Sequence, residues 1–427
     1  MKTQRRQQVM SRATVAVYHL NGCERCAWHT LAIDDWDELE LIHHCLRDGR
    51  SADIKADIII LTGYATERDI PVLEQLSSRC TRMVGYGTCP YSGGIFGLAN
   101  QKGADVISAC HLAGPGLAVL GCPPDPQELR GALLYEHPEE TKNLCKSCSR
   151  KMTDDLFYNI QRVNAIEDTE TCFNHLGQPC SGVVSGSCAQ RCIDFNTPCR
   201  GCIEIVEDPT SSMISYFGTM ARQVEVATVG NAWTTDKLSD EPDELTEGLV
   251  DVVGTFFRFH LATAFSQPGR IPSTGDIRSD IMVGRPIEEA VQIAATIYGI
   301  HGVSVALNLI EAYETSVEFK PSEETLRLRA SLREAQQQIL EAREQPRYEA
   351  YSSAMDKIRE VAGNEVLSNL FFFGFKTPVE VSKSPFETYR TKTFEPTAVS
   401  GSSKDEDSKV SFATDERGII REWSCEL

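Results

Sequence analysis

Short apolar runs, rich in β-branched residues, recur through the first third of the chain, at residues 13–20, 56–64, 82–87 and 117–121. Each run is bounded by glycine or polar residues, which is typical of parallel strands buried on both faces. Between them, residues 36–46 and 66–78 carry apolar side chains at helical spacing. This succession predicts βαβ units and a doubly wound α/β sheet.

Thiols directly follow three of the predicted strands. They are Cys23 and Cys26 after the first strand, Cys89 after the third and Cys122 after the fourth. In an open α/β sheet the carboxyl ends of the strands meet at the edge where ligands bind. We therefore expect these four thiols to form one metal site. The alternative is a set of ordinary βα turns with incidental buried cysteines.

Eight of the sixteen cysteines lie within residues 145–202, namely Cys145, Cys148, Cys172, Cys180, Cys188, Cys192, Cys199 and Cys202. The pairs 23/26, 145/148 and 199/202 have C-x-x-C spacing, which lets two thiolates reach one metal from a tight turn. Zinc and iron–sulfur clusters both fit this spacing, and zinc is strongest for the last four cysteines. Together with the strand-end thiols, twelve cysteines divide into three sets of four, the number that a cubane cluster needs.

The remaining composition narrows the class of protein. The chain has 427 residues, 41% hydrophobic and 24% charged, which favours a soluble protein of two or three domains. Its net charge of −19 argues against a nucleic-acid ligand. No apolar run approaches the eighteen or so residues that span a bilayer, and no apolar region follows the basic start. We expect a cytoplasmic protein, whose reduced thiols favour metal binding over disulfides.

Three motifs carry a family resemblance: G-C-E-R-C at residues 22–26, G-T-C-P-Y-S-G-G-I at 87–95 and G-C-P-P-D-P-Q-E-L at 121–129. With the cysteine run at 172–202, they resemble the electron-transferring small subunit of nickel–iron hydrogenases, closest to the cytoplasmic methyl-viologen-reducing and sulfhydrogenase types. The resemblance covers about residues 13–220. It implies a flavodoxin-like sheet domain followed by a cysteine-rich iron–sulfur domain.

The resemblance also implies three 4Fe-4S clusters and their ligands. These are Cys23, Cys26, Cys89 and Cys122 for the proximal cluster, Cys145, Cys148, Cys172 and Cys180 for the distal cluster, and Cys188, Cys192, Cys199 and Cys202 for the medial cluster. The chain departs from the family at Arg25, where a glycine usually packs against the catalytic large subunit. Burying Arg25 and the adjacent Glu24 would be costly unless both are paired, so we expect a changed neighbouring surface, or side chains that point to solvent.

Residues 280–314 resemble the first metal-binding region of the hydrogenase large subunit. In the frame of that family's R-I-C-G-I-C motif, this chain reads T-I-Y-G-I-H at residues 296–301, with Val305 where a histidine follows. Both nickel-bridging cysteines of the motif are therefore missing, and the second C-x-x-C of the family is absent as well. We expect a degenerate fragment without hydrogen chemistry, in which His301 is an ordinary residue. The alternative is a plain amphipathic helix.

Five segments are predicted: a flexible arm at 1–12, the sheet domain with the proximal cluster at 13–138, a two-cluster domain at 139–222, a helical large-subunit-like region at 223–345 and an extension at 346–427. Within these, residues 234–247 are an acidic linker, a long charged helix begins near Pro321, and residues 367–375 form an apolar patch that needs covering. The polar stretch 400–408 is expected to be disordered.

These observations favour an electron-transfer subunit of a cytoplasmic oxidoreductase complex, with substrate chemistry on other subunits. By resemblance the complex could be of the heterodisulfide-reductase type. Two alternatives remain: the small subunit of an active nickel–iron hydrogenase with a separate large subunit, and a zinc-stabilised scaffold without redox activity. No G-x-G-x-x-G or P-loop fingerprint occurs, so flavin or nicotinamide would belong to other subunits.

Overall fold

The computed structural model describes residues 12–112, 117–134, 143–153, 170–186, 188, 191–194, 197–203, 251–263, 275–362 and 398–427. All sixteen cysteines fall within these ranges. Residues 1–11 of the predicted arm, the acidic linker at 234–247 and the apolar patch at 367–375 lie outside the described residues.

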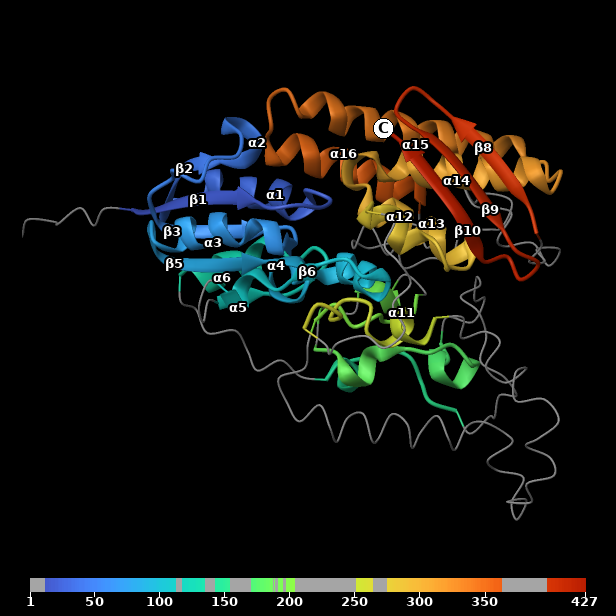
Figure 1. Ribbon diagram of the computed structural model, residues 1–427, viewed down its shortest axis with the longest axis horizontal. Helices are drawn as coiled ribbons and strands as arrows, with labels where there is room; N and C mark the ends of the chain where they lie inside the picture. The colour runs from blue at the N-terminus through green and yellow to red at the C-terminus, as the bar shows by residue number, and fades with distance from the viewer. Residues whose placement is uncertain are drawn as a thin grey trace, which may run out of the picture.

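The N-terminal domain is built on a five-stranded parallel sheet, as predicted (Figure 1). Its strand order is β2-β1-β3-β5-β7, with bounds Leu39–His44, Ala13–His19, Ala56–Thr62, Cys80–Tyr86 and Leu117–Val119. The order places the first strand inside the sheet and lets the chain wind outward in both directions. This arrangement is that of a flavodoxin-like α/β domain.

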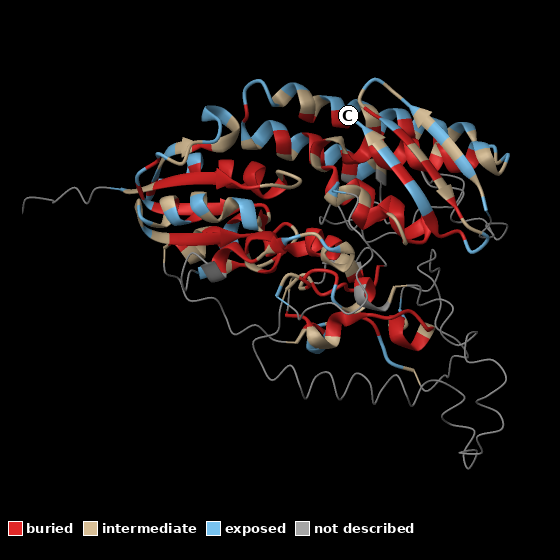
Figure 2. Ribbon diagram, viewed as in Figure 1, coloured by how far each residue is buried: buried red, intermediate tan, exposed pale blue. Residues whose placement is uncertain are grey.

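Both faces of the sheet are buried (Figure 2). Val15 and Val17 of β1 pack on one face with helix α6 (Pro126–Leu133), and Ala16 and Tyr18 pack on the other with helix α3 (Ile70–Ser77). Successive side chains of a strand point to opposite faces, so a strand covered on both sides reads as a continuous apolar run. This explains why the sequence pattern identified β1, β3, β5 and β7.

The helix predicted over residues 36–46 is wrong, because most of this segment is strand β2. Its pairing with β1 begins at Ala13 and Leu39, and only α2 (Cys45–Asp48) follows as a single helical turn. The strand lies at the edge of the sheet, where Ile42 remains 44% exposed. Edge exposure breaks the continuous apolar run that marks the inner strands, and the remaining apolar positions matched helical spacing.

Short elements make up the connections of the sheet domain and most of the described cysteine-rich region. In the sheet domain these are α1 (Arg25–Thr30), η1 (Leu31–Asp35), β4 (Ala65–Thr66), η2 (Glu67–Asp69), α4 (Thr88–Ser92), η3 (Gly94–Lys102), β6 (Val106–Ile107) and α5 (Ala109–Leu112). The cysteine-rich region contains η4 (Leu144–Lys146), η5 (Phe173–Leu176), η6 (Ser181–Val184) and α7 (Arg191–Asp194). Among its described residues, the buried core is small: Leu144, Phe173, Cys180, Ile193 and Cys199.

The helical region comprises α11 (Val252–Phe256), α12 (Ile277–Met282), α13 (Ile287–Ile297), η7 (Gly299–His301), α14 (Gly302–Ser316), α15 (Glu323–Ala342) and α16 (Tyr348–Ala362). Helix α15 begins as predicted, with the Ser322 hydroxyl accepting a hydrogen bond from the Thr325 backbone N–H at 3.2 Å. One continuous core joins these helices to Trp28, Leu31 and Phe96 of the sheet domain. The two parts therefore share buried apolar surface.

The expectation of a disordered tail at residues 400–408 is also wrong. Strands β8 (Ser400–Lys404), β9 (Lys409–Thr414) and β10 (Ile420–Glu426) form an antiparallel sheet that packs on α14. Val410 and Phe412 are buried in the shared core, while the Ser304 hydroxyl donates to Asp405 Oδ1 at 2.7 Å. The polar turn is ordered because helices α14 and α15 supply partners for its side chains, which composition alone does not reveal.

None of the described helices is both long enough and apolar enough to cross a membrane.

A buried ion pair between Arg329 and Glu314 joins α15 to α14, with N–O distances of 2.7 and 2.6 Å. Replacing Arg329 with methionine leaves a buried carboxylate without this partner, and we expect a loss of about 3–5 kcal/mol in the free energy of unfolding. Arg327→Met on the same helix is the control, since Arg327 is exposed and pairs only at the surface. Equal denaturant midpoints for the two variants would contradict a stabilising role of the buried Arg329–Glu314 pair.

Candidate metal centres

The four thiols predicted to form the proximal site all follow strands whose carboxyl ends share one edge of the sheet. Cys23 and Cys26 flank the start of α1 after β1, Cys89 lies in α4 after β5, and Cys122 follows β7. Hydrogen bonds fix the last two loops together, because Thr88 N donates to Gly121 O at 3.0 Å and Gly87 N to Val119 O at 2.9 Å. The sheet thus brings together residues that are almost a hundred positions apart.

The electrostatics of these thiols show that they lie close enough to interact. Burial raises the pKa of Cys26, Cys89 and Cys122 well above the usual range. The neighbouring thiols raise these pKa values further: Cys23 and Cys122 act on Cys26, Cys23 and Cys26 on Cys89, and Cys89 and Cys23 on Cys122. Four such thiolates require a compensating positive charge, and a coordinating metal deprotonates its thiols and supplies that charge.

Two glycines allow the backbone to approach these sulfur atoms. A Cβ atom on Gly87 would lie 2.6 Å from Cys26 Sγ, and one on Gly94 would lie 2.5 Å from Cys89 Sγ. Both positions also have positive φ, 101° and 55°, which L residues rarely adopt. A residue with a side chain would therefore displace a thiol, so the glycines preserve the space around the predicted site.

The distal set of predicted ligands is also brought together. The pKa of Cys145 is raised to about 12, because the surrounding protein partly desolvates its sulfur atom and the thiols of Cys180, Cys172 and Cys148 lie near it. Asn143 Oδ1 accepts from Cys145 N and Asn174 Oδ1 from Cys180 N, both at 2.8 Å, which fixes the two loops. Cys145 is exposed whereas Cys180 is buried, so this set lies at the protein surface.

The medial set lies between the other two. Burial raises the pKa of Cys192, with further contributions from Cys202, Cys199 and Cys188. Cys199 N donates to Cys180 Sγ of the distal set at 3.3 Å. Thr88, adjacent to Cys89 of the proximal set, donates from its hydroxyl to Cys202 O at 2.6 Å. The three sets therefore adjoin in the order proximal, medial, distal.

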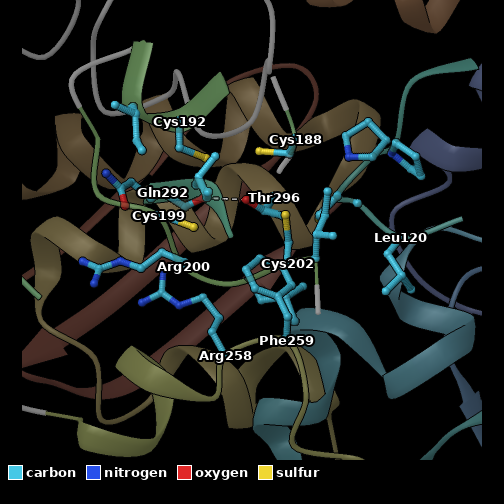
Figure 3. A pocket seen from close by; sticks show the side chains of 18 of the residues that line it. Leu120, Cys188, Cys192, Cys199, Arg200, Cys202, Arg258, Phe259, Gln292 and Thr296 are labelled. Atoms are coloured by element: carbon cyan, nitrogen blue, oxygen red, sulfur yellow. Dashed lines mark hydrogen bonds between the residues drawn. The ribbon is translucent and has the colours of Figure 1, made fainter. Parts of the chain in front are cut away.

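A hollow of about 820 Å³, which includes space open to solvent, lies between the proximal and medial sets (Figure 3). The sulfur atoms of Cys188, Cys192, Cys199 and Cys202 gather around it. Arg200 and Arg258 also line it, as do Gln292 and Thr296 of α13. These four residues are not among the predicted site residues. Only the position of Arg200, between two predicted ligands, could have indicated its role.

A single zinc ion would draw four thiolates to about 2.3 Å from one centre, whereas a cubane cluster spreads them around four irons. The donor set, the buried thiols and the glycine-lined space fit a larger sulfur-ligated group.

The helical region covers the loop that carries the first two cysteines. A Cβ atom on Gly299 would lie 2.2 Å from Cys23 O, so η7 is in direct contact with the ligand backbone. The rings of Trp28 and Tyr351 stack at 5.2 Å between α1 and α16. These contacts place the T-I-Y-G-I-H segment at residues 296–301 directly against the predicted proximal site.

The interpretation that Arg25 and Glu24 simply point to solvent is wrong. Arg25 is only 4% exposed, and its Nη2 donates to Ala295 O of α13 at 2.7 Å. Glu24 forms an ion pair with Arg343 at 3.2 Å. Both charged residues thus have partners in the helical region, as expected for a changed neighbouring surface.

The other cysteines do not join the three sets. Cys45, Cys80 and Cys110 lie in the sheet domain, and Cys110 packs against Gly85, whose Cβ would lie 2.6 Å from its sulfur. Cys425 interacts with Tyr298, and the Tyr298 hydroxyl accepts from Trp423 Nε1 at 3.0 Å. His301 is half-buried, and burial lowers its pKa.

Comparison with known proteins finds related oxidoreductase subunits. Residues 15–135 match the family model described as NADH ubiquinone oxidoreductase, 20 Kd subunit. The chain is 28% identical over 301 residues to a subunit of the F420-non-reducing hydrogenase of Methanothermobacter marburgensis, covering 57% of this chain and 93% of that protein. It is 32% identical over 92 residues to a subunit of the NADH-quinone oxidoreductase of a Nocardioides species, covering 21% and 47%.

Among solved structures, a chain of an NAD+-reducing [NiFe]-hydrogenase in the H2-reduced state is similar with a TM-score of 0.23 and 17% identity, covering 30% of this chain and 95% of that one.

We predict that Gly87→Ala lowers the iron and sulfide content per chain, because its Cβ would displace Cys26 Sγ. Gly49→Ala is the matched control: Gly49 also has positive φ, 78°, but a Cβ there meets nothing within 4 Å. Both variants carry similar backbone strain, so their iron and acid-labile sulfide contents isolate the effect of the lost space. Equal contents in the two variants would argue against the glycine's role.

Proposed function

Because residues 15–135 match an oxidoreductase family and the chain is similar to a hydrogenase subunit, we propose that it is the iron–sulfur electron-transfer subunit of a larger oxidoreductase complex. It would relay single electrons through three 4Fe-4S clusters and would not carry substrate chemistry. The observation that carries this proposal is that the three thiol sets adjoin one another in a row. A hydrogen bond from Thr88 joins the proximal set to the medial set, and one from Cys199 joins the medial set to the distal set.

We assign four thiolates to each cluster. The proximal cluster would be held by Cys23, Cys26, Cys89 and Cys122, the medial by Cys188, Cys192, Cys199 and Cys202, and the distal by Cys145, Cys148, Cys172 and Cys180. When bound, the clusters supply reversible one-electron oxidation and reduction. The protein excludes water from the inner thiols: Cys26, Cys89, Cys180 and Cys199 are all buried.

A backbone donor beside one sulfur atom would tune the medial cluster. Gly201 N donates to Cys199 Sγ at 3.4 Å, whereas the Ser185 hydroxyl donates to Ser181 O at 2.8 Å and accepts from the Cys199 thiol. Hydrogen bonds to cluster ligands stabilise the more negative, reduced form and so raise the reduction potential. The exposed Cys145 makes the distal set the natural point of electron exchange with a partner.

We also propose that residues 280–314 are a degenerate large-subunit fragment that has become a cover for the proximal site. By resemblance, the loop at residues 22–26 would face a catalytic large subunit. Here η7 and α13 of the same chain occupy that position, through Gly299 and Ala295. This favours an electron relay over the small subunit of an active nickel–iron hydrogenase, because a separate large subunit would have to displace these contacts.

The partners would be other redox subunits, since the similar proteins carry subunit names from hydrogenases and NADH-quinone oxidoreductases. A complex of the heterodisulfide-reductase type is one candidate. The reduced thiols required for all twelve ligands favour a cytoplasmic location.

Anaerobic purification with metal and sulfide analysis tests the proposal. We expect about twelve iron and about twelve sulfide per chain, as three cubanes require, and no nickel in the native complex. Nickel together with hydrogen-isotope exchange would instead support the hydrogenase alternative. Zinc in place of iron, or about four iron per chain, would refute the three-cluster relay.

Removing the iron should unfold the cysteine-rich region selectively. Its described hydrophobic core has only five buried residues, two of which are the cysteines Cys180 and Cys199, so we expect metal binding to supply much of its folding free energy. Limited proteolysis after chelation under reducing conditions should cleave within residues 143–203 while the sheet domain resists. Identical cleavage patterns with and without iron would contradict this prediction.

A further inference from the structure

Arg25 occupies an unusual position for a charged side chain. It is the first residue of α1, between Cys23 and Cys26, and is only 4% exposed. Burying a guanidinium costs several kcal/mol unless strong polar contacts compensate. A residue kept at this cost, inside the loop that carries two proposed ligands, requires a specific explanation.

One contact anchors the guanidinium to the helical region. Arg25 Nη2 donates to Ala295 O at 2.7 Å, and Ala295 lies in the last turn of α13. The final carbonyls of a helix lack intrahelical donors and carry the negative end of the helix dipole. The end of α13 therefore holds a cation at this point, where a mobile surface arginine would be screened by water.

The anchored charge reaches the proximal thiols. Burial, and then the neighbouring thiols, raise the pKa of Cys26 and Cys122, whereas the Arg25 charge lowers the pKa of both. Cys26 follows β1 and Cys122 follows β7, so these two proposed ligands come from different strand ends. The guanidinium therefore acts on two of the four proposed ligands, and one of them, Cys26, follows Arg25 directly in the buried first turn of α1.

We propose that Arg25 is a positioning residue that raises the reduction potential of the proximal cluster, with the end of α13 holding its charge in place. Reduction adds one negative charge to a cluster that four thiolates already make anionic, so a fixed cation stabilises the reduced form. This inference rests on the proposed function, and the experiment below separates the two.

The test is a redox titration followed by electron paramagnetic resonance on the full-length protein, with the proximal signal identified as the one lost in Cys89→Ala. At the wild-type midpoint, Arg25→Gln should lower the ratio of reduced to oxidised proximal cluster at least tenfold, equivalent to about 59 mV for one electron. Arg25→Lys retains the charge and should change the ratio less than threefold. The medial and distal signals should move less than the proximal signal in both variants.

Arg343→Gln is the matched control. Arg343 also pairs across the interface, with Glu24, but its side chain is 49% exposed and its charge is screened by solvent. We expect no change in the proximal ratio for this variant. A shift as large as that of Arg25→Gln would indicate a general effect of loosening the interface and would overturn the proposal.

Three further outcomes separate the role of Arg25 from the proposed electron relay and from a role in folding. An unchanged ratio in Arg25→Gln, with full iron content, overturns the role of Arg25 and leaves the relay intact. Wild-type protein without three clusters refutes the proposed function itself. If Arg25→Gln fails to fold, the same titration is done on Arg25→Gly, because the family resemblance leads us to expect glycine at this position. If neither neutral variant folds while Arg25→Lys does, the contribution of Arg25 is to folding and the proposal is overturned.

Discussion

Four thiolates cannot share a buried site unless a positive charge lies among them, and this constraint organises most of the molecule. Burial and mutual repulsion raise the pKa of Cys26, Cys89 and Cys122 together, so the sheet edge is stable with thiolates only when they ligate a metal. The surrounding features meet the same requirement. Gly87 and Gly94 leave room beside the sulfur atoms, and Arg25 adds a further cation.

The need for a positive charge among buried thiolates also explains why the sheet domain and the cysteine-rich region are built differently. The sheet domain has apolar cores on both faces of a five-stranded sheet and needs no metal to bury them. The described part of the cysteine-rich region buries few apolar residues and consists of short turns whose backbone amides face sulfur or side-chain oxygen, as at Cys145 and Cys180. We therefore propose that metal ligation stabilises this region, whereas side-chain packing stabilises the sheet domain.

Sequence patterns predicted the parts of the structure that depend on local spacing. The inner strands followed from continuous apolar runs, the convergence of the strand-end thiols from the predicted sheet, and the start of α15 from the residues near Pro321. The failures involve long-range contacts. Strand β2 depends on an edge position, the hairpin at residues 400–414 depends on partners from α14 and α15, and Arg25 bonds a carbonyl 270 residues away. No local sequence pattern indicates these long-range contacts.

The contact between Gly299 and Cys23 has a further consequence, because both residues belong to one polypeptide. In a two-chain assembly such a contact would be a subunit interface, and its occupancy would depend on protein concentration. Here the covalent connection sets an effective concentration that does not change on dilution. The proximal thiols therefore keep their cover at any expression level, and the stoichiometry between cover and site is fixed at one to one by translation itself.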